Sequence, residues 1–193
     1  PAADVGAAAA AAAACARGTG SGPAPADAMR AHSGPVHTLQ FHPGAPRQLL
    51  ESGRLLLSAS ADCCGTVRLW DCAAHAAPGG GGAPALLHSI EGAADCVLDA
   101  RWSPRRCTLL ATADAAGSVA LWDLAHDIGR PAARAPVTPP HACARLGWAP
   151  DGRTFAVGDS AGVIHLERVS AELSEPQPDD AHRLADRLGF ALA

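Results

Sequence analysis

The sequence predicts an all-β protein built from three similar antiparallel units in a row. The same order of features occurs three times: an apolar strand ending in Pro, a second apolar strand ending in Asp, and a third strand that follows Gly. The turn aspartates Asp62, Asp114 and Asp159 lie 52 and 45 residues apart. Similarity at such a period is the signature of a repeat architecture, in which neighbouring units bury each other's faces.

Each unit has the strand pattern of a small antiparallel sheet. Short apolar or alternating runs ended by Pro, Asp or Gly are typical of antiparallel strands joined by tight turns. The turn Asp is followed three residues later by Gly, because this hairpin needs an acceptor for turn amides and a residue tolerant of positive φ. We expect units at 31–75, 87–128 and 142–170, with strands at 36–43, 55–62, 65–71, 97–104, 109–114, 117–123, 144–150, 155–159 and 162–167.

Three segments interrupt or precede these units. Residues 1–30 are Ala, Gly and Pro with almost no large apolar side chain, so we expect a low-complexity linker or an inserted loop. Residues 76–86 contain four consecutive glycines and predict a flexible loop. Residues 129–141 contain four prolines, so they predict a loop and exclude a central strand.

The tail, residues 171–193, predicts one short helix. Asp179 or Asp180 can cap its start, and the small and apolar residues that follow share one face: Ala181, Leu184, Ala185 and Leu188. An amphipathic helix of this kind can dock on its own protein or on a partner. We favour docking on its own units.

Composition argues against several classes of ligand. The net charge is −4, with 15 basic and 19 acidic side chains spread along the chain, so there is no basic stripe for nucleic acid. The longest apolar run, 7–14, is alanine, which is too weakly hydrophobic to drive membrane insertion. Seven cysteines, an odd number with Cys63 next to Cys64, favour reduced thiols in the cytosol over a disulfide framework.

The sequence contains no recognisable catalytic or metal-binding set. Zinc needs four convergent ligands, whereas the nearest pairs are Cys72 with His75 and His37 with His42. No Gly-rich phosphate loop opens a helix, and no Gly-x-Ser-x-Gly elbow occurs. We therefore expect no enzyme activity, no cofactor, no metal and no small-molecule substrate.

The tryptophans recur at equivalent strand positions, which favours core packing for all four. Trp70-Asp71 and Trp122-Asp123 end the first two units, and His32-Ser33-Gly34 precedes the first. These residues resemble WD40 repeats, whose fold is a β-propeller. The resemblance implies about three four-stranded antiparallel blades. Propellers typically have about 4–8 blades, so we expect the rest of the ring to be missing from this chain and the chain to be part of a longer polypeptide.

In WD40 repeats a His, a Ser or Thr, the turn Asp and the Trp form a buried hydrogen-bond network. His32, Ser58, Asp62 and Trp70 match this set in the first unit. The later units depart from it, since Ala93 replaces the His and Leu166-Glu167 replaces Trp-Asp in the third. We expect those blades to be held mainly by apolar packing. Because Asp62, Asp114 and Asp159 belong to different blades, we interpret them as turn residues rather than an acidic site.

Residues 97–169 are similar to the last blades of dynein intermediate chains. The similarity rests on 97–104, on 121–124, and on the string Val-Gly-Asp-Ser-x-Gly-x-Ile-His at 157–165. It implies a non-catalytic motor subunit whose propeller binds the dynein heavy chain tail, with a second intermediate chain and light chains as further partners. It also implies a location on the cytoskeleton of the cytoplasm, cilium or flagellum. Ciliary-transport, axonemal and cytoplasmic dyneins all fit.

A generic WD40 adaptor, such as a substrate receptor of a ubiquitin ligase, is the alternative. Such receptors usually carry Trp-Asp-x-Arg, whereas Ala73 and Ala125 occupy the Arg position here. Under either interpretation, the candidate partner contacts are charges inside otherwise apolar strands, where a guanidinium at a propeller face or channel can pair with a carboxylate: Arg68, Arg101 and Arg145.

Overall fold

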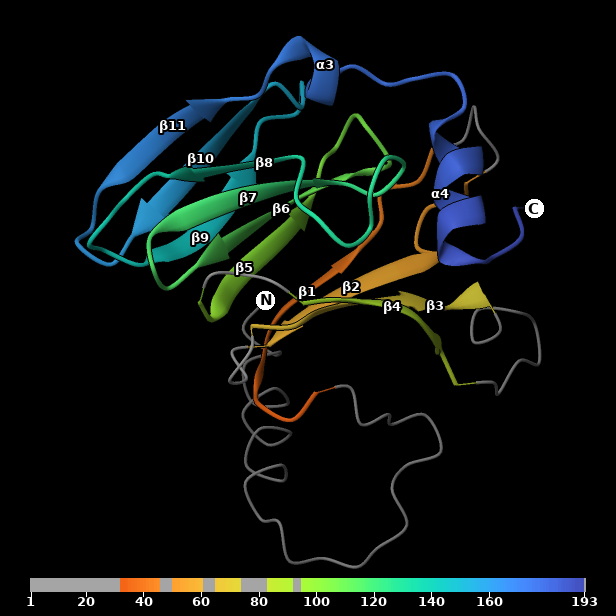
Figure 1. Ribbon diagram of the computed structural model, residues 1–193, viewed down its shortest axis with the longest axis horizontal. Coiled ribbons are helices and arrows are strands. Elements are labelled where there is room, and N and C mark those ends of the chain that lie inside the picture. The colour runs from red at the N-terminus through yellow and green to blue at the C-terminus, as the bar shows by residue number, and fades with distance from the viewer. Residues whose placement is uncertain (1–31, 46–49, 61–64, 74–82, 92–94, 193) are drawn as a thin grey trace, which may run out of the picture.

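The computed structural model describes residues 32–45, 50–60, 65–73, 83–91 and 95–192, which form three antiparallel sheets side by side (Figure 1). The first sheet has the order β1 (Val36–Phe41), β2 (Leu55–Ser60), β3 (Val67–Asp71), β4 (Ala85–Ile90). The second has the order β5 (Val97–Trp102), β6 (Leu109–Asp114), β7 (Ser118–Asp123), β8 (Ala133–Pro136). The third has the order β11 (Ile164–Arg168), β10 (Thr154–Asp159), β9 (Cys143–Trp148).

These sheets confirm the predicted all-β class and the partial propeller. The described residues of the third sheet form three strands, however, and not the four that we expected for every blade. The sheets are copies of one another even in their irregularities. The first and second strands of each sheet change register at the same place, between Val36 and Thr38, between Val97 and Asp99, and between Gly158 and Asp159.

The fourth strands lie where the sequence predicted loops. Strand β4 begins inside the expected loop 76–86 and continues through residues assigned to the second unit, yet it pairs with β3 of the first sheet. Strand β8 lies within the proline-rich segment 129–141 and pairs with β7. Both are edge strands, which hydrogen-bond on one side only and tolerate proline and exposed residues. All four residues of β8 are exposed, so no apolar pattern marks it in the sequence.

The hydrophobic core is divided between the two spaces that separate the sheets. Leu57 and Leu69 of the first sheet pack with Trp102 and Trp122 of the second. The opposite face of the second sheet packs its Val119 against Phe155 of the third. Full burial of one such side chain contributes about 1.5–3 kcal/mol, so these contacts hold the sheets face to face. Three tryptophans are buried. Trp148 is half-buried, and its ring is tilted by 57° against the ring of Phe155, with 5.3 Å between the centroids.

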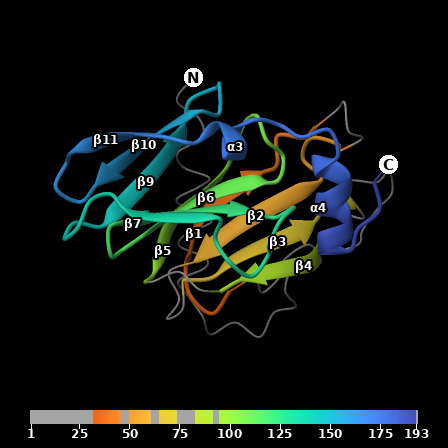
Figure 2. The same cartoon turned by 45° about the horizontal axis from the view of Figure 1, so that its top comes forward.

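The tail runs back from the third sheet to the first. It contains α3 (Ala171–Ser174) and α4 (Asp180–Leu188), and Figures 1 and 2 show α4 beside the first sheet, near the start of β2. The predicted helix face is buried in the same cluster as the first two sheets, so the tail docks on its own blades. The helix starts after Asp179, but this N-cap residue makes no capping bond through its side chain.

Candidate partner-binding surfaces

The first two sheets each keep part of one polar network beside the Trp position. In the first sheet, Ser58 is buried, lies 2.7 Å from His32 Nε2, and accepts a 2.9 Å bond from Trp70 Nε1. Asp62, the fourth residue matched to this network, lies outside the described residues. In the second sheet, Trp122 Nε1 donates to Thr112 Oγ1 at 3.0 Å. The bonds donated by the two tryptophans join β2 to β3 in the first sheet and β6 to β7 in the second.

The third sheet has a different polar pair. The strand register places Glu167 at the Trp position and Arg168 at the Asp position, so the sequence alignment of Leu166-Glu167 with Trp-Asp was wrong by one residue. His165 Nε2 lies 3.1 Å from Asp159 Oδ2. The blades that depart from the repeat pattern therefore still contain a side-chain bond of their own, in addition to the apolar packing that we expected to dominate.

The turn aspartates hold the hairpins that follow the middle strands. Asp114 accepts from the Ser118 amide at 2.8 Å, and Asp159 accepts from the amides of Ala161 and Val163 at 2.9 and 2.8 Å. The bond from Val163 is the main reason that the pKa of Asp159 is lowered, whereas burial raises the pKa of Asp114. Gly117 has a φ of 82°, and a Cβ there would lie 2.4 Å from the His141 carbonyl oxygen, so the turn requires glycine.

The aspartates of the Trp-Asp pairs lie at the other end of the sheets, next to arginines. Asp71 pairs with Arg54 at 3.2 Å, and Asp123 pairs with Arg106 at 2.9 Å. The third sheet has Arg168 at the equivalent position, paired in register with Thr154 as Asp71 is with Leu55. The carboxylate is replaced by a guanidinium there.

Arg106 links the second sheet to the tail and is buried. Its Nε lies 3.1 Å from Asp180 Oδ2 at the start of α4, and its Nη1 donates to the Glu172 carbonyl at 2.9 Å. Two further arginines contact the tail: Arg54 lies over the ring of Phe190, 4.8 Å from its centroid, and Arg153 pairs with Glu175. One arginine from each sheet thus contacts the tail.

The sequence reasoning did not find Arg106. A repeated signal was available, because an arginine lies 17 residues before the Asp of the Trp-Asp pair in both of the first two units, as Arg54 and Arg106. The second carboxylate partner, Asp180, lies 74 residues away and has no such signal. The tail covers the end of the sheets at which the second strands, β2, β6 and β10, start. The opposite end, which carries the hairpins of Asp114 and Asp159, is free of tail contacts among the described residues.

Asp99 joins the first strands of all three sheets and was also missed. It is fully buried on β5, where it accepts a 2.7 Å bond from Thr38 Oγ1 on β1 and a 2.9 Å bond from the Leu146 amide on β9. Arg101 Nε pairs with the same carboxylate at 3.2 Å. A lone charge inside an apolar strand was the signal that could have drawn attention to Asp99, as it did for the arginines.

The three candidate arginines do not form one cluster. Arg101 and Arg145 lie on the neighbouring strands β5 and β9, whereas Arg68 lies on β3, opposite Ser58. Arg101 is engaged by Asp99 of its own strand, and Arg145 is exposed and donates to the carbonyl groups of Leu98 and Ala144 at 3.3 and 3.0 Å. The first strands of the three sheets, β1, β5 and β9, are called the inner strands below. Among the Asp, Glu and Arg side chains of these strands, that of Arg145 is the most accessible to solvent.

The two outer sheets expose apolar faces whose repeat equivalents are buried. Phe41 on β1 is 57% exposed, whereas Trp102 occupies the same position on β5 and is 1% exposed. Leu166 on β11 is 73% exposed, whereas the equivalent Leu121 on β7 is 9% exposed. The buried residues are covered by a neighbouring sheet. The exposed faces therefore have the shape and character of blade-to-blade contacts, as an incomplete ring requires.

The described residues include histidine, cysteine and carboxylate side chains, which are the kinds that bind metals or act as nucleophiles. No group of three or more His, Cys, Asp or Glu side chains within them could hold a metal ion. Burial raises the pKa of the Cys107 thiol to about 12 and also raises the pKa of Cys72 and Cys143, so these thiols are protonated at neutral pH. None of the described helices is long and apolar enough to span a membrane.

His42 is buried in one neutral form, which makes folding sensitive to acid. A carbonyl only accepts, so Nε2 donates to the Cys107 oxygen at 2.8 Å, and Nδ1 accepts from the Gly44 amide at 2.8 Å. Burial lowers the pKa of His42 from 6.5 to about 4. Between these two values the unfolded chain binds a proton that the folded chain does not. Stability should therefore fall by up to about 3 kcal/mol as the pH drops through this interval.

Urea unfolding of the native chain and of His42→Gln between pH 7 and pH 4 measures this effect. The carboxyl groups that also titrate are the same in both proteins, so the difference between the two unfolding free energies isolates the imidazole. We expect this difference to shrink as the pH falls. A constant difference would show that His42 is not the source of the acid sensitivity.

The comparisons with known proteins agree with this geometry. The family described as "WD domain, G-beta repeat" matches residues 25–71. Over 157 residues, 81% of this chain, the sequence is 31% identical to a protein named "Cytoplasmic dynein 1 intermediate chain" from Drosophila melanogaster. The chain spans 22% of the length of that relative.

Two solved structures have the same fold. The WD40 domain of Toxoplasma gondii coronin superposes with a TM-score of 0.56 at 20% identity, covering 71% of this chain and 32% of that one. The C-terminal WD40 domain of Sif2 superposes with a TM-score of 0.54 at 24% identity, covering 76% of this chain and 35% of that one. With its repeated sheets, its Trp-Asp pairs and these matches, the chain is a WD40-repeat protein whose sequence is similar to that of a dynein intermediate chain.

Proposed function

We propose that this chain forms part of the propeller of a dynein intermediate chain, a non-catalytic scaffold that binds the tail of a dynein heavy chain. The observation that carries the proposal is the 31% identity to a dynein intermediate chain over 81% of the residues. The exposed faces of the outer sheets support it, because they fit blades of the same ring. A second intermediate chain and light chains are the further partners that the proposal includes.

We assign to the heavy chain the end of the sheets that lies opposite the tail, together with the inner strands β1, β5 and β9 at that end. This end is called the free end. The tail occupies the opposite end through Arg106, and in the described residues this free end carries the hairpins of Asp114 and Asp159. Arg145 is exposed on the inner strand β9 and can pair with a carboxylate of the partner. Arg68 and Arg101 are secondary candidates, since Arg101 is already paired with Asp99.

Purification of the tagged full-length protein from its own cells, followed by mass spectrometry, tests the assignment. We expect a dynein heavy chain and light chains to be recovered together with a second intermediate chain. Recovery of a ubiquitin-ligase core without any dynein subunit would favour the adaptor alternative and overturn the proposal.

A pair of charge reversals tests the surface separately. Arg145→Glu should lower heavy-chain recovery by about tenfold or more, because one charged pair at an interface is worth about 1.5 kcal/mol or more. Arg183→Glu is the matched control, since Arg183 is exposed on α4 at the tail end. Equal loss with both variants would remove Arg145 from the interface without affecting the dynein assignment.

The cellular location follows from the class of motor. A scaffold of this kind works on the cytoskeleton of the cytoplasm, and a ciliary or flagellar location is the finer proposal. Imaging of the tagged protein in ciliated cells distinguishes the two: signal along the axoneme supports the ciliary motor, and signal confined to the cell body contradicts it.

A further inference from the structure

A mostly apolar cavity lies between the second and third sheets. Its volume is about 210 Å³, and strands β7 and β8 border it on one side, with β10, the end of β11 and α3 on the other. A drug-sized ligand needs roughly 300–1,000 Å³, so this cavity suits a single side chain. The lining residues on which the argument rests are Val119, Leu121, Val137, Phe155, Glu167 and Leu173.

The cavity lies where the second sheet has a tryptophan and the third sheet has Glu167. Trp122 is the equivalent residue of the second sheet, and it is buried in one cluster with Leu69 of the first sheet. The strand register places Leu121 of the second sheet where Leu69 lies in the first, and Leu121 lines the cavity. The space that an indole fills between the first two sheets is therefore left open between the second and the third.

The hydrogen-bond acceptor for the tryptophan is replaced as well. Trp122 Nε1 donates to Thr112, whereas Val157 occupies the position of Thr112 in the third sheet. Glu167 supplies a different acceptor, because it is half-buried, lines the cavity and makes no hydrogen bond or ion pair with the described residues. The cavity therefore combines an apolar wall with one carboxylate that can accept from a ligand.

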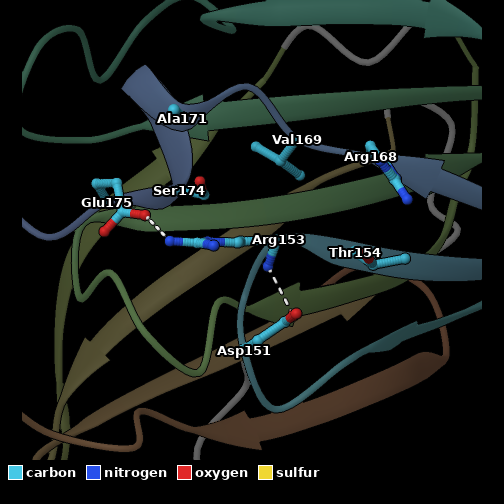
Figure 3. A pocket seen from close by; sticks show the side chains of 8 residues that line it. All are labelled: Asp151, Arg153, Thr154, Arg168, Val169, Ala171, Ser174 and Glu175. Atoms are coloured by element: carbon cyan, nitrogen blue, oxygen red, sulfur yellow. Dashed lines mark hydrogen bonds and ion pairs between the residues drawn. The ribbon is translucent and has the colours of Figure 1, made fainter.

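Nearby arginines decide which kind of donor suits this carboxylate. Arg134 and Arg168 line the cavity, and Figure 3 shows Arg153 of the same sheet directed at Glu175 of the tail. The two lining guanidinium groups repel a further cation, so a lysine or arginine side chain is disfavoured. An indole has an apolar body and one neutral N–H donor, which matches both the wall and the carboxylate.

The outer edge of β11 can hold the peptide that carries such an indole. The Val169 amide donates to the Arg153 carbonyl next to β10, so the backbone groups of Leu166 point away from β10. In the second sheet, the carbonyl of the equivalent Leu121 accepts from the Ala132 amide, just before β8. Among the described residues, no strand pairs with β11 on this side. An extended segment can therefore add to this edge.

We propose that this cavity binds a tryptophan side chain of a partner protein, carried by an extended segment that pairs with the outer edge of β11. The indole fills the space between Leu121 and Phe155, and its N–H donates to the Glu167 carboxylate. The four tryptophans of this sequence are held in strands of the sheets, so the occupant comes from outside the sequence. The proposal does not depend on the surface assigned to the heavy chain, which uses the inner strands.

Fluorescence anisotropy with the full-length protein tests the site. The probe is a fluorescein-labelled peptide, Thr-Val-Thr-Trp-Thr-Val-Thr, whose alternation places Trp and both Val on one face of a strand. We expect saturable binding that weakens by about tenfold or more when Ala replaces the Trp of the peptide, because the buried apolar surface is lost. Phe in its place should weaken binding by about fivefold, because the ring then has no N–H donor.

Substitutions of Glu167 test the cavity from the side of the protein. Glu167→Gln should weaken binding by about fivefold, because a neutral acceptor replaces a charged one. Glu167→Trp should abolish binding by filling the cavity, while its thermal unfolding temperature stays equal to or above that of the native protein. Glu172→Trp is the matched control, since Glu172 is exposed on α3 and does not line the cavity, and it should bind as the native protein does.

Several outcomes would overturn the proposal. Equal binding of the Trp and Ala peptides would show that the cavity takes no side chain. Tighter binding of a peptide with Lys in place of Trp would show that Glu167 selects a cation. Undiminished binding by Glu167→Trp would place the peptide elsewhere on the protein, and a native protein that binds none of these peptides would contradict the site altogether.

Discussion

Replacing Arg106 with methionine is expected to lower the free energy of unfolding by about 3–5 kcal/mol, the cost of removing one partner from a buried ion pair. The variant leaves the carboxylates of Asp123 and Asp180 without their guanidinium, and both are more than nine-tenths buried. The Glu172 carbonyl also loses its donor. Methionine keeps most of the volume of the arginine stem, so the loss reports the charge network rather than a cavity.

Urea unfolding measures the effect, and hydrogen exchange locates it. We expect the amides of α4 to exchange faster in Arg106→Met, because Asp180 is the first residue of that helix. The matched control is Arg105→Met, which changes an exposed neighbour in the same loop and should have little effect. A tail that stays protected in Arg106→Met would mean that apolar packing alone holds α4 on the sheets.

Replacing Asp99 with alanine is expected to cost about 3 kcal/mol or more, since each buried group left without its partner costs about 1–3 kcal/mol. The Leu146 amide and the Thr38 hydroxyl lose their acceptor, and Arg101 loses its counter-ion. These groups lie on the first strands of three different sheets. The variant should therefore weaken the contacts between blades more than the pairing within each blade.

Hydrogen exchange resolved to single amides tests this distinction. We expect the Leu146 amide to lose protection in Asp99→Ala, while the amides that join β2 to β3 keep theirs. Asp95→Ala is the control, because Asp95 is exposed and its carboxylate accepts a hydrogen bond from the amide of the adjacent Cys96 rather than from another sheet. Uniform loss of protection throughout the chain would show global destabilisation instead of a joint between blades.

The sequence by itself determined the features that depend on neighbouring residues. Alternating apolar runs, an Asp followed by Gly three residues later, and a helical i, i+3, i+4 face encode the strands, hairpins and tail helix directly. The hairpin glycines Gly117 and Gly162 indeed have φ values of 82° and 84°. The repeat of this pattern predicted the propeller, because each unit exposes a face that only another unit can cover.

Only the tertiary structure decided the features that depend on distant residues. Strands β4 and β8 are edges with little apolar patterning, so their place is set by the strand beside them rather than by their own residues. Arg106 meets Asp180 across 74 positions, and Asp99 meets Thr38 and Leu146 across 61 and 47. A charged side chain is stable in the core only where such partners converge. Local periodicity describes the chain's backbone, and it carries no information about which distant polar groups the packed sheets bring together.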